Sequence, residues 1–222
     1  PFLALLINHF HVTLIVLFTA GVQLIASLSL SDIRNRIWIV GSSLVKRAFL
    51  HARRSFEGSQ LGLSRYHASV WWQGKGGLRW RELEPFIRHL LTVEDIPQIL
   101  VIHCGGNDIG QCVSCGLRHA IVKTLHKLMQ LLPDTIFVWS QILPRLEWRN
   151  EIVHEAVERV RPRVNSKVAS YLTGLGGKYI TYPELQDCNP EFFVDKVHLS
   201  NLGNDIFLYH VQQDLCGILA NC

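Results

Sequence analysis

The sequence predicts an α/β fold, a three-layer α/β/α sandwich with a flavodoxin-like parallel sheet of about five strands. Two observations lead to this prediction. After Ser31, short apolar runs alternate with longer amphipathic stretches, the pattern of successive βαβ units. Polar and glycine-rich clusters follow the apolar runs, where parallel strands end and loops lead into helices.

The strands and helices can be placed from this alternation. Strands are expected at residues 37–40, 68–72, 98–103, 135–140 and 178–181, and helices at residues 44–54, 79–91, 115–131, 148–172 and 202–219. Pro162 lies inside the fourth helical stretch. Because proline has no amide hydrogen and its ring meets the preceding helical turn, we expect a kink or two separate helices there.

The amino-terminal segment differs from the rest of the 222-residue chain. Residues 1–30 contain no Lys, Arg, Asp or Glu, and residues 12–30 are almost wholly apolar. We therefore place residues 1–31 outside the domain and residues 32–222 within one domain. A membrane anchor, a degenerate secretory signal and translated sequence foreign to the domain remain as alternatives, and the first would make the protein membrane-associated.

Positive charge is concentrated between residues 46 and 88, where the only acidic residues are Glu57, Glu82 and Glu84. The basic residues of this region are Lys46, Arg47, Arg53, Arg54, Arg65, Lys75, Arg79, Arg81 and Arg88. A solvated basic face is the commoner explanation of such a region. The alternative is attraction to nucleic acid or to an anionic membrane.

The six cysteines are too few and too scattered for a fold held by disulfides. Cys112 and Cys115 form a C-x-x-C pair, and His119 follows at a spacing that suits a metal ligand. A structural zinc site needs four ligands, however, and no second pair is evident. We therefore predict no metal site at these cysteines.

Three residues have the chemistry and the placement of a catalytic triad. A serine hydroxyl becomes a strong nucleophile when a base removes its proton and a third group orients that base. Ser43 stands where the first strand turns into a helix, and Asp195 precedes His198 by three residues. Asp195 is then close enough to accept from Nδ1 of His198 and to leave Nε2 facing Ser43.

The same edge of the sheet offers donors for a negatively charged oxygen. The N–H groups of Ser43 and Gly77 and the side-chain amide of Asn107 are expected to form an oxyanion hole. Each motif alone has a common structural explanation as a helix cap or a turn. Their order, each after a predicted strand or before the last helix, argues against coincidence and favours a serine hydrolase.

These clusters resemble the four blocks of the SGNH hydrolase superfamily, the GDSL-like esterases. The blocks are G-S-S at 41–43, G-K-G-G at 74–77, G-G-N-D at 105–108 and D-K-V-H at 195–198, and the match spans about Arg36 to Gln213. The stretches I-W-I-V-G-S-S-L-V, H-C-G-G-N-D-I-G and D-K-V-H-L-S-N-L-G-N-D-I-F are also similar to SGNH domains of fish and amphibian genomes, many in transposable-element reading frames. The resemblance implies a three-layer α/β/α fold and ester hydrolysis or deacetylation without metal or organic cofactor.

Two residues depart from the pattern of this family. Ser42 stands where the first block normally has Asp, and Lys196 stands where a small residue is usual. The Gly-x-Ser-Leu spacing selects Ser43 over Ser42 as nucleophile. A cation at position 196 would disfavour the charged form of His198 if it faced inward, but a long lysine is expected to point outward.

A second hypothesis belongs to a different class of function. A catalytically weak or inactive module could keep the fold and bind nucleic acid or membrane through residues 46–88, as part of a transposable-element-derived protein. The presence of Ser43, Asn107, Asp195 and His198 together favours the enzyme. His103, which ends the third predicted strand, is expected to be a buried structural residue.

Overall fold

The sheet of the computed structural model confirms the predicted fold class. The structure describes residues 35–111, 114–148 and 154–221, so the predicted segment 1–31 lies outside the described residues. The strands are β1 (Asn35–Gly41), β2 (Ala68–Gly74), β3 (Ile99–His103), β4 (Ile136–Ser140) and β5 (Lys178–Ile180). All neighbours pair in parallel in the order β2-β1-β3-β4-β5, which is the flavodoxin-like order.

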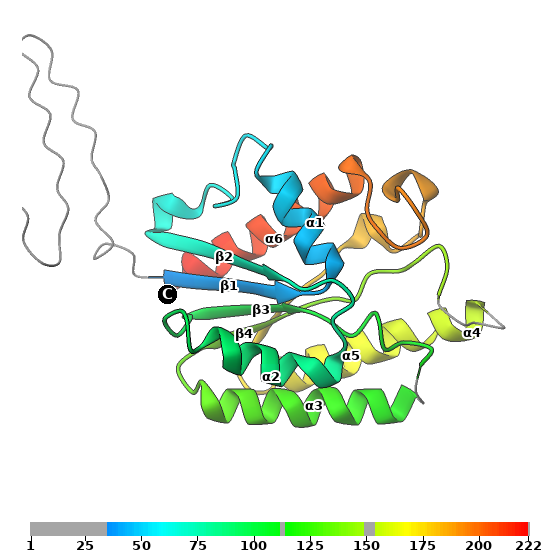
Figure 1. The fold of residues 1–222 in the computed structure, drawn as a ribbon, viewed down its shortest axis with the longest axis horizontal. Helices are drawn as coiled ribbons and strands as arrows, with labels where there is room; N and C mark the ends of the chain where they lie inside the picture. Colours follow the sequence, from blue (N-terminus) through cyan, green and yellow to red (C-terminus); the bar gives the residue numbers. More distant parts are fainter. Residues whose placement is uncertain (1–34, 112–113, 149–153, 222) are drawn as a thin grey trace, which may run out of the picture. The chain divides into compact units, whose positions relative to one another are not determined.

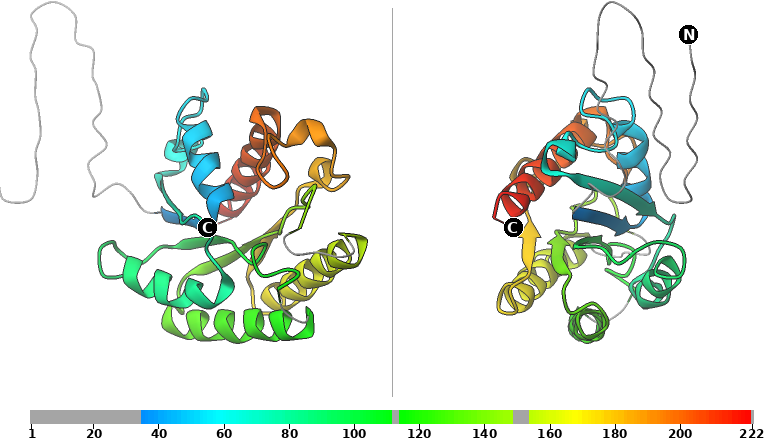
Figure 2. Two further views of the ribbon diagram at one scale, coloured as in Figure 1. Left: turned by 45° about the vertical axis from the view of Figure 1, so that its right-hand side comes forward. Right: turned by 90° about the vertical axis from the view of Figure 1, so that its left-hand side faces the viewer.

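Helices cover both faces of this sheet (Figure 1). The helices on one face are α1 (Ser43–Ala52) and α6 (Asn201–Leu219), and those on the other are α2 (Trp80–Leu90), α3 (Ser114–Leu131) and α5 (Val160–Thr173). The loops also contain the 3₁₀ turns η2 (Leu63–Tyr66), η3 (Pro183–Leu185) and η4 (Pro190–Phe192). Figure 2 shows the three layers from two further directions. In the described part of the chain, no helix is long and apolar enough to cross a membrane.

The helical stretch that contains Pro162 is divided, as predicted. A short helix, α4 (His154–Glu158), ends four residues before Pro162, and α5 begins at Val160. Because Pro162 has no N–H to donate to the carbonyl of Glu158, a continuous helix would lose a hydrogen bond at that turn. The chain turns at Arg159 instead.

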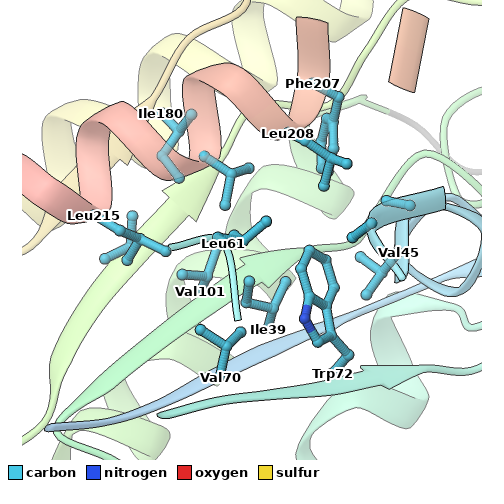
Figure 3. Packing of buried hydrophobic residues seen from close by; sticks show 14 of the residues in the cluster. Ile39, Val45, Leu61, Val70, Trp72, Val101, Ile180, Phe207, Leu208 and Leu215 are labelled. Atoms are coloured by element: carbon cyan, nitrogen blue, oxygen red, sulfur yellow. The ribbon is translucent and has the colours of Figure 1, made fainter. Parts of the chain in front are cut away.

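The central strands supply both halves of the core. Successive side chains of a strand point to opposite faces, so Ile37 and Ile39 of β1 pack toward α1 and α6, whereas Trp38 and Val40 pack toward α2 and α3. Figure 3 shows the half of the core that lies between the sheet and helices α1 and α6, with Phe207 of α6 among its labelled residues. Burial on both faces explains why the central strands are continuous apolar runs in the sequence.

The end of β1 is tightly packed against the strand beside it. A Cβ atom at Gly41 would lie 2.3 Å from the carbonyl oxygen of His103 and 2.5 Å from Cγ2 of Val45. The first contact is with backbone at the end of β3, which cannot move without disturbing the sheet. Glycine at position 41 is therefore required by close approach, two residues before Ser43.

This packing predicts a large stability difference between two Gly→Ala variants. Gly41→Ala is expected to lower the free energy of unfolding by at least about 2 kcal/mol, because the new methyl group overlaps the backbone of His103. Gly76→Ala is the matched control, since a Cβ atom there meets nothing within 4 Å. Its effect is expected to be about 0.5 kcal/mol or less in urea unfolding. Equal destabilisation by the two variants would contradict the close-approach explanation.

Candidate active site

Ser43 is placed at the amino end of α1 by the turn that follows β1. Ser42 is the N-cap residue with an extended backbone, and its N–H donates to the carbonyl oxygen of His103 at 3.4 Å. The first N–H groups of a helix have no partner within the helix, and the helix dipole places positive potential there. The N–H of Ser43 makes no backbone hydrogen bond within the described residues. It is therefore free to bind a negatively charged oxygen beside the Ser43 hydroxyl.

The structure brings His198 to Ser43 across a separation of 155 residues. Oγ of Ser43 lies 3.0 Å from Nε2 of His198, and Nδ1 of His198 lies 2.8 Å from Oδ2 of Asp195. The loop that carries both residues is closed by an antiparallel bridge between Phe193 and Leu199. The three predicted triad residues thus form one continuous chain of hydrogen bonds.

Asp195 is held as an ionised carboxylate by its own loop. Its Oδ1 accepts from the N–H groups of Val197 at 2.8 Å and His198 at 2.7 Å. Partial burial acts to raise the pKa of Asp195, but these hydrogen bonds and that from the His198 ring outweigh it and lower the pKa to about 2. An ionised carboxylate only accepts hydrogen bonds, so the proton of neutral His198 resides on Nδ1. Nε2 is then the acceptor that faces Ser43.

The other predicted oxyanion donors lie on the loops that follow β2 and β3. Gly77 has a φ of 71°, a left-handed conformation that favours glycine, and its N–H has no backbone acceptor among the described residues. Among the described residues, nothing lies within 4 Å of a Cβ built there, so the left-handed backbone, and not crowding by the protein, favours glycine at this position. Asn107 donates from Nδ2 to the carbonyl oxygen of Leu78 at 3.0 Å. Since β1 lies between β2 and β3, the loops of Ser43, Gly77 and Asn107 are neighbours.

Two residues that touch this region were missed in the sequence. Asp108, the last residue of the third block, accepts the N–H of Trp80 at 2.9 Å and so caps the start of α2. Arg145, in the loop after β4, donates to Oδ1 of Asn107 at 3.0 Å. A basic residue shortly after a strand, at the edge where the other clusters gather, is the signal that could have pointed to Arg145.

Lys196 points away from the triad, which confirms the expected outward orientation. Its Nζ lies 3.5 Å from Oε2 of Glu147, and its side chain is 68% exposed. The N–H of Glu147 also donates to the carbonyl oxygen of Lys196 at 3.3 Å. These contacts join the loop after β4 to the loop that carries Asp195 and His198.

Several cations of the basic region are paired with acidic neighbours. Lys75 lies 3.2 Å from Glu82, and Arg88 lies 3.1 Å from Glu84. Such pairs reduce the positive field expected from composition. The basic side chains of Lys46, Arg47, Arg53 and Arg54, on α1 and just after it, are exposed.

His103 is buried and structural, as expected. Its Nδ1 lies 2.8 Å from Oγ of Ser140, which in turn lies 2.6 Å from the hydroxyl of Tyr182, and its ring meets Phe207 edge-on. Burial lowers the pKa of His103 to about 4, and the nearby charge of Arg145 acts in the same direction. His103 is therefore neutral at the pH where proteins usually work.

Cys115, His119 and two cavities of the described residues lie apart from Ser43, His198 and Asp195. Cys112 is outside the described residues, while Cys115 and His119 line a cavity of about 320 Å³ on α3. In the described ranges, no group of three His, Cys, Asp or Glu side chains is placed to hold a metal ion. A cavity of about 520 Å³ opens at the amino ends of β4 and β5, beside Asp214, and involves none of the predicted site residues.

Comparison with known proteins identifies the fold. No protein-family model and no curated protein sequence matches the chain. Solved structures do match. A GDSL-like lipase from Bacteroides thetaiotaomicron shares 16% identity over 85% of this chain and 90% of its own, with a TM-score of 0.65.

Two other solved structures give a similar result. A lipase/acylhydrolase from Enterococcus faecalis has 14% identity, 82% and 96% coverage and a TM-score of 0.61. A carbohydrate acetylesterase from Sinorhizobium meliloti has 10% identity, 83% and 100% coverage and a TM-score of 0.65. The domain therefore shares the fold of these GDSL-like lipases and acylhydrolases. At these identities the likeness establishes the fold alone.

The depressed pKa of His103 predicts a pH-dependent stability. Between its ordinary value of 6.5 and about 4, the unfolded chain binds a proton that the folded protein does not, so the stabilisation present above pH 6.5 is lost as the pH falls through this window. At about 1.4 kcal/mol per pH unit, the full effect is about 3 kcal/mol. His103→Asn keeps a donor near Ser140 but does not titrate. Between pH 7.5 and pH 4.5, the free energy of unfolding in urea should fall less for this variant than for wild type. Equal falls in the two proteins would contradict the lowered pKa of His103.

Proposed function

We propose that the protein is a serine esterase that hydrolyses small acyl or lipid esters. The observation that carries this proposal is the hydrogen-bond chain from Ser43 through His198 to Asp195, with heavy-atom distances of 3.0 Å and 2.8 Å. These distances suit direct proton transfer between nucleophile and base. A fold that needed only stability would gain little from three partly exposed polar side chains in this order.

The geometry supports a two-step acyl transfer. Oγ of Ser43 attacks the ester carbonyl carbon while Nε2 of His198 takes the hydroxyl proton. The same proton then passes to the leaving alcohol oxygen as its bond to carbon breaks, which leaves an acyl group on Ser43. Water attacks that group, gives a proton to Nε2, and the carboxylic acid departs as the serine hydroxyl is restored. Asp195 stabilises the positive charge on His198 in both steps.

The oxyanion of each tetrahedral intermediate needs donors that are already in place. The N–H groups of Ser43 and Gly77 and the amide of Asn107 are the groups we assign to it, on the loops after three adjacent strands. Loss of one such donor typically costs about a hundredfold to a thousandfold in rate. The names of the structural neighbours, which include a lipase and a carbohydrate acetylesterase, support esters of small acyl groups or of lipids as substrates.

A non-catalytic role for the basic region is the second candidate. The exposed side chains of Lys46, Arg53 and Arg54 favour an interaction with nucleic acid or an anionic membrane, in a module of transposable-element origin. Pairing of Lys75 and Arg88 with glutamates weakens that candidate. A binding role does not explain the hydrogen-bonded arrangement of Ser43, His198 and Asp195, so the enzyme is the better supported function.

Ser43→Ala provides the main test. The variant is expected to lose labelling by a fluorophosphonate and to lower kcat for a short-chain aryl ester by at least about 10³-fold, because no nucleophile remains at Nε2 of His198. The matched control is Ser42→Ala, which removes the adjacent hydroxyl and is expected to keep most of the labelling and turnover. Loss of activity in Ser42→Ala alone would show that Ser42, and not Ser43, is the nucleophile. Equal turnover by Ser43→Ala and wild type would contradict the proposed function.

Asp195→Asn tests the orienting role of the carboxylate. The amide can donate to Nδ1 of His198 and thereby favour the tautomer with its proton on Nε2, which cannot accept from Ser43. We expect kcat to fall by about 10²- to 10⁴-fold with little change in KM. Asp205→Asn is the control, because Asp205 also binds a histidine, His51 at 2.6 Å, but outside the triad. Steady-state kinetics of both variants should separate them, and similar losses would argue against the role of Asp195.

A further inference from the structure

The side-chain amide of Asn107 has a fixed polarity. A guanidinium group only donates hydrogen bonds, so the Asn107 atom that lies 3.0 Å from Nη2 of Arg145 must be the oxygen Oδ1. Nδ2 consequently faces the other way, where one of its two hydrogens is donated to the carbonyl oxygen of Leu78 at 3.0 Å. The second hydrogen of Nδ2 is the one left for an oxyanion. Without a cation at Oδ1, the amide could rotate and present an acceptor to the negative charge.

Arg145 is built into the protein in a way that fixes its guanidinium. The residue is only 4% exposed, and its guanidinium carbon lies 4.9 Å from the ring centre of Trp148. A Cβ atom at Gly106 would lie 2.9 Å from Nη2 of Arg145, so the glycine before Asn107 leaves space for this group. The loop of Arg145 is also tied across the site, since the N–H of Glu147 donates to the carbonyl oxygen of Lys196.

We propose that Arg145 is a positioning residue for the oxyanion hole, which holds the Asn107 amide with its N–H group toward the developing negative charge. This inference rests on the proposed esterase function. Arg145 acts through Asn107 and does not touch the reacting atoms. Because the guanidinium is buried, its hydrogen bond to Oδ1 also polarises the amide, which makes the remaining Nδ2 hydrogen a stronger donor.

The role makes a kinetic prediction that a purely structural arginine would not. Arg145→Met is expected to lower kcat for an uncharged aryl ester by about 10- to 100-fold, somewhat less than removal of an oxyanion donor, while KM changes little. Arg145→Lys keeps the charge and should restore part of kcat. In an Asn107→Ala background, Arg145→Met should cost less than about twofold, because residues that act through one another are not additive. If Arg145→Met does not fold, the lysine variant gives the same comparison between backgrounds.

A second measurement is independent of activity. The side-chain amide protons of Asn107 can be assigned in the nuclear magnetic resonance spectrum of the full chain by their loss in Asn107→Ala. In wild type, the proton bonded to Leu78 should exchange slowly with solvent, and Arg145→Met should accelerate this exchange at least tenfold, since the amide is then free to rotate.

The outcomes separate this inference from the proposed function. Unchanged amide exchange in Arg145→Met, or equal kinetic losses in the presence and absence of Asn107, would overturn the role of Arg145. A rise in KM confined to negatively charged esters would also overturn it, because Arg145 would then bind substrate directly. A wild-type chain without Ser43-dependent turnover would overturn the esterase function, while the exchange measurement would still decide whether Arg145 holds Asn107.

Discussion

The candidate site depends on the position of β1 in the sheet, between β2 and β3. Parallel strands end at one edge, so a central first strand places the turn that holds Ser43 between the turns that hold Gly77 and Asn107. His198 and Asp195 come from the loop before α6, a helix that shares the hydrophobic cluster of α1. The strand order β2-β1-β3 therefore brings together loops from distant parts of the sequence.

The two halves of the site differ in their exposure to solvent. The side chain of Asp195 is 44% exposed and that of His198 is 22% exposed, whereas Arg145 behind Asn107 is 4% exposed. Water therefore screens charges near Asp195 and His198 more than it screens the guanidinium of Arg145. The side chains of Asp195 and His198 are open to solvent, whereas the cation bound to Oδ1 of Asn107 is buried.

Sequence periodicity was sufficient for the layers and the strands, because burial on two faces makes β1 and β3 continuous apolar runs and burial on one face makes the helices amphipathic. The proximity of Ser43, His198 and Asp195 could also be predicted, since each follows a strand or precedes a helix. The contacts of Arg145, Asp108 and Glu147 could not be predicted in the same way. They join loops that are far apart in the sequence, and their geometry depends on the lengths and turns of those loops, which leave no periodic signal.

The distance along the chain between Ser43 and His198 has a consequence for folding. These residues are 155 positions apart, and α6 reaches α1 through packing and through the contact of His51 with Asp205. Contacts of such long range carry a high entropic cost of loop closure and form late in folding. During synthesis, the ribosome releases the serine long before its histidine. The hydroxyl of Ser43 accordingly lacks its hydrogen bond to His198 in every partly synthesised chain, and under the proposed function it becomes a nucleophile only when the last helix docks.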